Sequence, residues 1–150
     1  MGLLTEGFPT KVTFTSDELT SGVVTFDVMN ELEVTPPGIA GGGANDTTGM
    51  RNVKFRTRHP KKLVTLTAST LIIKYDPAVY DEMMAMVNDN QAITIAFSND
   101  ATLVFWGWVD SFTPDACVEG AQPTATAVIE PSNMDADNNN AEIAPVYAAA

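Results

Sequence analysis

The sequence lacks most of the residues on which metal sites and nucleophilic enzymes depend. Its 150 residues include one cysteine, Cys117, and one histidine, His59. A single cysteine excludes an internal disulfide and is typical of a chain made in a reducing cytoplasm, and one Cys with one His cannot complete a Cys/His zinc site. One cysteine and one histidine are enough for a catalytic Cys–His dyad, but His59 stands in a basic run and Cys117 in an expected turn, which disfavours that dyad. We therefore predict no enzyme activity, no catalytic or metal-binding residue and no cofactor.

Long hydrophobic runs are also missing. No apolar stretch approaches the ~20 residues of a membrane-spanning helix, and residues 1–6 lack the charged and apolar regions of a signal peptide. Hydrophobic residues make up 45% of the chain, as in ordinary globular proteins. We expect no membrane contact and one domain, residues 1–131, with an N-terminal arm at 1–10. Residues 132–150 are Asp/Asn-rich and then Ala-rich, which predicts an acidic C-terminal tail.

Charge of one sign is absent from two long stretches. Residues 47–75 hold seven bases and no acid, whereas residues 76–150 hold twelve acids and no lysine or arginine, within a total of −11. A nucleic-acid patch is disfavoured because only Phe55 interrupts the bases as a stacking aromatic and the acidic body repels phosphate. A plain solvated loop remains open. We favour a docking arm for an acidic partner, since the complementary charge is present in the same chain.

Hydrophobic periodicity predicts a mainly β fold, a two-sheet β-sandwich or barrel of about seven strands with one flanking α-helix at about 77–88. Asp76 is the expected N-cap and Pro77 the first helical residue. The expected buried face of the helix consists of four residues: Tyr80, Met83, Met84 and Val87. The expected strands are 11–15, 23–29, 31–35, 53–57, 63–75, 92–97, 102–113 and 123–130.

Residues 38–52 show no apolar period and contain three consecutive glycines. They predict a long loop that is mobile in the free chain and becomes ordered against an adjacent subunit, because nothing in the segment offsets the entropy lost on ordering. With the basic run that follows, this loop forms our predicted subunit interface. Its predicted residues are Gly41, Gly42, Gly43, Arg51, Lys54, Arg56, Arg58, Lys61 and Lys62.

The expected strand 102–113 carries large apolar residues on both faces, including Phe105 and Val109 on one and Trp106 and Trp108 on the other. Such a strand needs two coverings. The helix with a second sheet supplies one, and a neighbouring subunit can supply the other. We expect both tryptophans to be buried. In the alternative, a monomeric immunoglobulin-like adhesion or carbohydrate-binding module, they form a ligand platform.

Several weak motifs occur in an order that resembles the major tail tube proteins of long-tailed bacteriophages, relatives of the type VI secretion tube protein. They are Lys74-Tyr75-Asp76-Pro77 leading into a helix, the strand 92–97, the stretch Val104-Phe105-Trp106-Gly107-Trp108-Val109-Asp110-Ser111-Phe112, and the closing strand 124–131. The match covers residues 53–131, and the long loop before it also resembles that family. Trp106 departs from the family, where this position is often polar.

The resemblance implies a β-sandwich with one helix that assembles as hexameric rings, stacked head to tail into a hollow tube for genome delivery. It implies copies of the chain itself as partners, together with tail tip, tape measure and terminator proteins. DNA would pass through the lumen without specific binding. The expected location is the virion, in a phage tail, after synthesis in the host cytoplasm.

Overall fold

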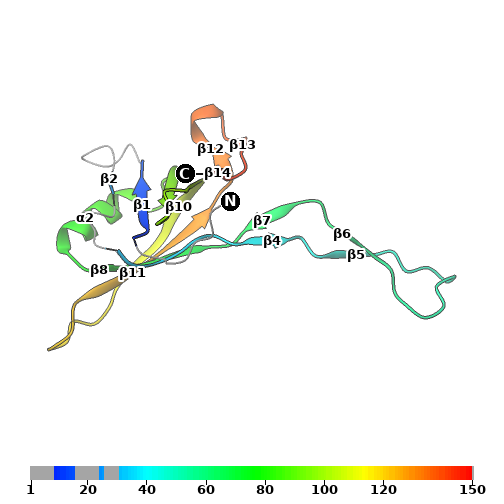
Figure 1. Cartoon of the computed structure of the whole chain (residues 1–150), viewed down its shortest axis with the longest axis horizontal. Coiled ribbons are helices and arrows are strands. Elements are labelled where there is room, and N and C mark those ends of the chain that lie inside the picture. Colours follow the sequence, from blue (N-terminus) through cyan, green and yellow to red (C-terminus); the bar gives the residue numbers. More distant parts are fainter. Residues whose placement is uncertain (1–8, 16–23, 26–30, 150) are drawn as a thin grey trace.

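The computed structural model describes residues 9–15, 24–25 and 31–149. Most of the predicted N-terminal arm (1–10) and of the predicted strand 23–29 lies outside these residues. The described chain forms a packed body from which one long, two-stranded ribbon projects (Figure 1). The body contains the buried residues, whereas residues 41–65 of the ribbon are all exposed.

The body is built on one eight-stranded antiparallel sheet. Its strand order is β2-β1-β9-β10-β11-β8-β3, and β14 pairs with β10 beside this path. The strands are β1 (Lys11–Phe14), β2 (Val24–Thr25), β3 (Glu31–Thr35), β8 (Ser69–Lys74), β9 (Gln91–Ala96), β10 (Thr102–Pro114), β11 (Thr124–Pro131) and β14 (Val146–Ala148). The predicted mainly β fold with one flanking helix is confirmed.

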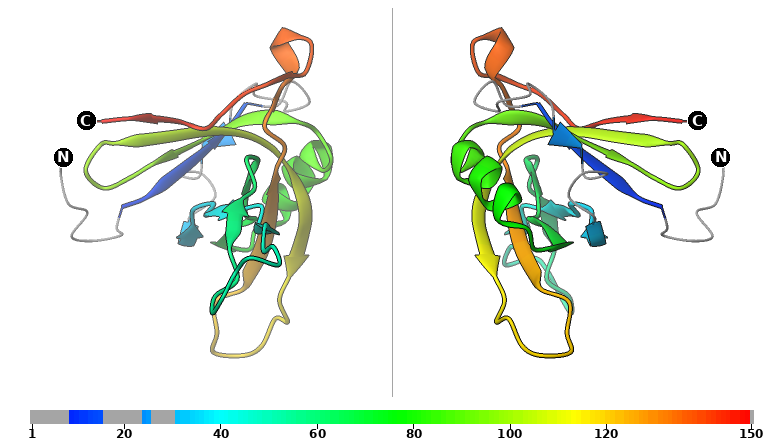
Figure 2. Two further views of the ribbon diagram at one scale, coloured as in Figure 1. Left: turned by 90° about the vertical axis from the view of Figure 1, so that its right-hand side faces the viewer. Right: turned by 90° about the vertical axis from the view of Figure 1, so that its left-hand side faces the viewer.

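Strand β10 divides the sheet into two layers. Its first half, from Thr102 to Gly107, pairs with β9, and its second half, from Gly107 to Pro114, pairs with β11. The register shifts between Val109 and Ser111 at an irregularity of the bulge type, which increases local twist. The sheet therefore folds over along β10 into a sandwich-like arrangement (Figure 2).

The core lies between these layers and follows the two-residue period of the strands. Strand β9 buries Gln91, Ile93 and Ile95 and leaves the alternate residues half-buried. The buried apolar cluster also includes Val12, Phe14, Leu66, Leu71, Ile73, Val79, Met83, Met86, Phe105, Val109, Ala125, Ala127 and Ile129. Each large side chain in such a core stabilises the fold by about 1.5–3 kcal/mol relative to exposure.

The single α-helix of the described residues, α2 (Pro77–Met86), closes one side of this core. Its predicted N-cap is confirmed, because the Asp76 carboxylate accepts a hydrogen bond of 3.0 Å from the amide of Ala78. The predicted buried face was wrong. The helix buries Val79, Met83 and Met86 instead, while three of the four predicted residues, Tyr80, Met84 and Val87, are exposed.

That error has a simple cause. The segment from Pro77 to Met86 is apolar around most of its circumference, and it carries two overlapping stripes with helical spacing. Periodicity locates the helix but does not choose between the stripes. The second stripe is left uncovered at the surface.

The projecting ribbon corrects the prediction of a long loop at 38–52. The segment contains β4 (Ile39–Gly41) and β5 (Ala44–Asp46), which pair with β7 (Val64–Leu66) and β6 (Arg58–Pro60), respectively. The predicted strand 53–57 is instead part of the turn at the far end. The predicted strand 63–75 is divided between β7 in the ribbon and β8 in the body.

The C-terminal segment is folded against the body. It contains β12 (Met134–Asp135), the short 3-10 helix η1 (Ala136–Asn138), β13 (Ala141–Glu142) and then β14. Strand β14 pairs with the start of β10 and so extends the main sheet. Within the described ranges, no helix has the length and apolar character needed to cross a membrane.

Candidate subunit interface in the hairpin arm

The hairpin arm, residues 36–67, is the part of the molecule that has no hydrophobic core of its own. Every residue from 41 to 65 is exposed. The arm extends well beyond the body as a thin ribbon (Figure 1), and side chains on both of its faces are exposed. An isolated two-stranded hairpin is only marginally stable in water. The arm therefore has the structure expected of an element that contacts something outside its own subunit.

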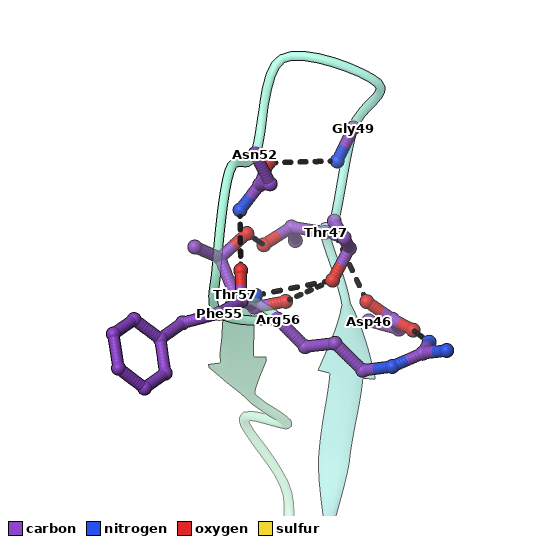
Figure 3. Close-up of polar contacts among 8 residues, drawn as sticks. Asp46, Thr47, Gly49, Asn52, Phe55, Arg56 and Thr57 are labelled. Atoms are coloured by element: carbon purple, nitrogen blue, oxygen red, sulfur yellow. Dashed lines mark hydrogen bonds and ion pairs between the residues drawn. The ribbon is translucent and has the colours of Figure 1, made fainter.

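Polar contacts hold the far end of the arm in a defined shape (Figure 3). The Asn52 side chain accepts a hydrogen bond from the Gly49 amide at 3.0 Å and donates one to the Phe55 carbonyl at 2.9 Å. The Thr47 amide donates to the Thr57 carbonyl at 2.9 Å and ties the two strands together. The tip is thus ordered by its turn contacts rather than by packing, and the Phe55 ring points away from the ribbon.

Asp46 links the two sides of the tip. Its carboxylate accepts a hydrogen bond from the Thr48 amide at 2.9 Å and lies 3.2 Å from the Arg56 guanidinium. Hydrogen bonds from Thr48, through its hydroxyl and its amide, lower the pKa of Asp46 below its ordinary value of 3.8, with a smaller contribution from Arg56. Both side chains of the ion pair are exposed, so water screens it and its contribution to stability is small.

All nine residues of the predicted interface lie on the arm and are exposed. The glycines stand in or directly after β4, Arg58 lies in β6, and the remaining bases flank β6 or belong to the tip. Among the described residues, Arg56 alone of these bases forms an ion pair, with Asp46 of its own chain. The structure therefore gathers the predicted residues on one projecting element, where the other bases face solvent.

The glycine run has a structural reason that the sequence did not reveal. A Cβ at Gly42 would stand 3.1 Å from the carbonyl oxygen of Leu63 and 3.2 Å from Cβ of Lys61, on the opposite strand. Gly43 has a φ of +88°, which L-residues rarely adopt. These two glycines let the strands approach and turn, so their role is to shape the arm.

Sequence reasoning missed the apolar side chains of the arm. Met50, Val53 and Phe55 project at the tip, and Phe55 is 80% exposed. Ile39, Leu63 and Val64 are exposed nearer the body. Exposed apolar residues gathered beside charged ones are typical of interaction surfaces. The alternation of Val53 and Phe55 predicted a strand, but a two-residue period does not show whether a core covers the apolar face.

The arm and the rest of the chain carry opposite charge. Residues 36–67 hold six lysine and arginine residues against one acid, a net +5, so the remaining residues carry −16 of the total of −11. Like charges within the arm repel one another, and an acidic surface in contact with it removes that cost. The arm of one copy is complementary in charge to the body of another.

Two other pairs of residues were considered from the sequence, His59 with Cys117 and Trp106 with Trp108. His59 lies on β6 of the arm, whereas Cys117 lies in the loop between β10 and β11, at the other end of the molecule (Figure 1). These two residues therefore form no dyad. Trp106 and Trp108 are only half-buried, because Phe105 and Val109 occupy the core side of β10. Within the single chain neither tryptophan is buried, so the expected burial of both stays a prediction for the assembled state.

Comparison of the sequence with known proteins gives no relative. No protein-family model matches the chain, and no curated protein matches it at a significant level.

Comparison of the fold does give similar structures. A chain of the baseplate of the anti-feeding prophage, determined with six-fold symmetry, superposes with a TM-score of 0.66 at 9% identity, over 90% of this chain and 96% of that one. A type VI secretion system protein superposes with a TM-score of 0.49 at 14% identity, over 91% and 90%, and this weaker similarity supports no conclusion. The chain shares the fold of a prophage baseplate protein.

Proposed function

We propose that this chain is a structural subunit of a phage tail, which polymerises as stacked hexameric rings into a tail tube, a hollow conduit for genome delivery. The observation that carries the proposal is the arm, an ordered element whose residues 41–65 are all exposed and whose charge is opposite to that of the body. The shared fold with a chain from a six-fold baseplate supports it.

The mode of assembly follows from where the complementary surfaces lie. An arm on one surface and an acidic body on another form a heterologous contact, which closes into rings or continues into a filament. Strand β3 pairs only with β8 among the described residues, so its other edge is open to a strand of a neighbouring subunit. Such pairing would remove an edge that otherwise promotes aggregation.

The acidic body fits the passage of DNA. Residues 76–150, which include β9, β10 and β11, carry twelve acids and no lysine or arginine. A lumen lined by such strands repels phosphates, and DNA moves through it without being bound. In this function the chain needs no catalytic residue. Its further partners are tail tip, tape measure and terminator proteins, and its location is the virion.

A second candidate is a closed ring within a baseplate, in place of an open tube. The specific support is that the structural neighbour is itself a baseplate chain. Both candidates use a heterologous contact made by the arm. They differ in whether the ring can stack on further copies of itself.

Electron microscopy of the purified chain tests both. Tubes of stacked rings are the expected result, single closed rings would favour the baseplate candidate, and a chain that stays monomeric at high concentration would contradict both. Arg58→Glu with Lys61→Glu should abolish assembly of a folded chain, whereas the matched Arg58→Lys with Lys61→Arg variant, which keeps the charge, should assemble. Raised salt should slow assembly of the wild type, because it screens exposed charges beyond ~8–10 Å.

A further inference from the structure

A shallow groove of about 320 Å³ lies between α2 and the second half of β10. Tyr80, Met84 and Val87 form its helical side, and Phe112 forms much of the other. Met84 is 61% exposed, and the groove is open to solvent along its length. Among the described residues no segment of the chain covers this apolar surface.

The walls of the groove are held rigidly by the body. The amide of Asn88 donates to the Val109 carbonyl at 3.1 Å and fixes the end of the helix to β10. At the other end, the rings of Tyr80 and Phe112 lie 6.1 Å apart, and Phe112 also stacks against Tyr75. The groove is therefore preformed, and a partner that enters it meets little further ordering cost.

The charges around the groove specify a cationic occupant. Asp110 lines it, and Asp81 and Glu82 lie on the helix that forms one wall. The segment 76–150, which supplies every residue of the groove, contains no lysine or arginine. A basic group that pairs with these carboxylates must therefore come from elsewhere.

The tip of the arm has the two required properties in one turn. Met50, Val53 and Phe55 present apolar side chains, and Arg51 and Lys54 alternate with them as bases. Leu63 and Val64 are also exposed beside Lys61 and Lys62, but Lys62, Leu63 and Val64 line a hollow together with residues 142–145 of the same chain. The pairing of apolar anchors with a charged rim is common at protein interfaces.

Geometry directs the tip to a second copy. The tip of the arm and α2 lie at opposite ends of the molecule, so a chain cannot fill its own groove (Figure 1). The ten residues from Gly41 to Met50, which include β5, span at most roughly 30 Å at ~3.3 Å per extended residue. A body of this size is about 35 Å across. The arm is long enough to reach along a neighbouring subunit.

We infer that the groove between α2 and β10 receives the arm tip of a second copy, with Phe55 inserted beside Met84 and a base of the tip facing Asp110. The inference rests on the proposed function and specifies the surface that the arm contacts. The contact is heterologous, and each subunit contributes one tip and one groove.

Cross-linking between two singly labelled copies tests this contact. In a Cys117→Ser background, a chain carrying Phe55→Cys is assembled with an equal amount of a chain carrying Met84→Cys and treated with a short bismaleimide. The expected result is a mixed dimer on a denaturing gel. The control replaces Met84→Cys by Val118→Cys, a site of nearly equal exposure (60% against 61%) outside the groove, which should give little mixed dimer.

A second measurement does not depend on cysteine chemistry. Tyr80→Ser with Met84→Ser changes only exposed side chains, so the chain should keep its circular dichroism spectrum and lose assembly at concentrations where the wild type is fully assembled. The matched variant Val118→Ser should assemble normally.

The outcomes distinguish failure of the contact between tip and groove from failure of the proposed assembly. If tubes or rings form while Phe55→Cys gives the same yield of mixed dimer with Val118→Cys as with Met84→Cys, the tip does not lie in the groove. In that case this inference is wrong, whereas the proposed function stands. If Met84→Cys reacts with a maleimide as fast in the assembly as in the monomer, no neighbouring copy covers the groove, which also contradicts the inference. A wild-type chain that never assembles contradicts both proposals.

Discussion

Strand β9 in the body buries every second side chain, whereas strands β5 and β6 of the arm bury none. Both regions are antiparallel ribbons, but only the body has neighbouring strands and a helix to cover it. Packing stabilises the body, while the arm depends on strand hydrogen bonds and a polar turn, which contribute little net stability in water. The apolar residues of the body are thus accounted for by packing within the subunit. Those of the arm are accounted for only by a contact with another molecule.

The largest contrast is expected for one phenylalanine in each region. Phe105 is 1% exposed, so Phe105→Ala should lower the free energy of unfolding of the monomer by about 3–5 kcal/mol. Phe55 is 80% exposed, so Phe55→Ala should change the free energy of unfolding by less than about 0.5 kcal/mol and yet raise the protein concentration at which the chain assembles. Urea titration at low protein concentration measures both. A comparable loss of stability in the two variants would show that the arm is part of the folding core.

A glycine in each region gives a second contrast. A Cβ at Gly107 in β10 would lie 2.5 Å from the carbonyl oxygen of Glu130, where a 2.8 Å hydrogen bond from the Ser132 amide to the Trp106 carbonyl holds the two strands. Gly107→Ala should therefore cost about 1–3 kcal/mol through forced displacement of the backbone. A Cβ added at Gly41 in the arm would meet no atom within 4 Å apart from those of its chain neighbours. Gly41→Ala should therefore leave the melting temperature unchanged. Equal melting temperatures for the two variants would contradict this account of β10.

The helix cap provides a smaller effect within the body. Asp76→Ala removes the side chain that accepts from the Ala78 amide, and it should destabilise the monomer by about 1 kcal/mol. Asp81→Ala, on the same helix but outside the cap, is the control and should change stability by only a few tenths. Thermal unfolding followed by circular dichroism distinguishes the two.

The smallest expected effect lies in the arm, at Asp46. Its pKa is lowered in the folded arm, so the ionised carboxylate stabilises the tip at pH values above 3.8, and this contribution is lost as the pH falls through the lowered pKa. An NMR titration of the side-chain carboxyl should give a midpoint below 3.8. Thr48→Val should raise that midpoint, whereas Thr48→Ser, which retains the hydroxyl, should keep it low. An unchanged midpoint in Thr48→Val would show that the tip contacts do not persist in solution.

The contrast between the packed body and the exposed arm also explains which elements could be predicted from the sequence. The helix start at Asp76, the buried alternation of Ile93 and Ile95, and the burial of Leu71 and Ile73 are local patterns that packing reinforces. The pairing of β4 with β7 carries no such pattern, because neither strand faces a core except at Leu66. A strand without a buried face has no two-residue period to detect, so residues 38–52 were interpreted as a loop.

The charge pattern of the sequence located the arm, but the apolar tip and the groove beside α2 were not predicted. The basic run identified the residues of the arm, since a charge imbalance is visible without any structure. The apolar tip and the groove beside α2 could not be predicted, because they depend on which helical stripe the core covers. Tyr80 and Met84 were expected inside and instead line the surface that we assign to the neighbouring arm.

Amide hydrogen exchange, compared between the monomer and the assembled protein, tests most directly whether the arm is an assembly element. The account predicts that amides of residues 39–65 exchange fast in the monomer and become strongly protected on assembly, while residues 93–109 are protected in both states. Equal protection of the arm in the two states, or fast exchange of the arm within intact tubes, would contradict it.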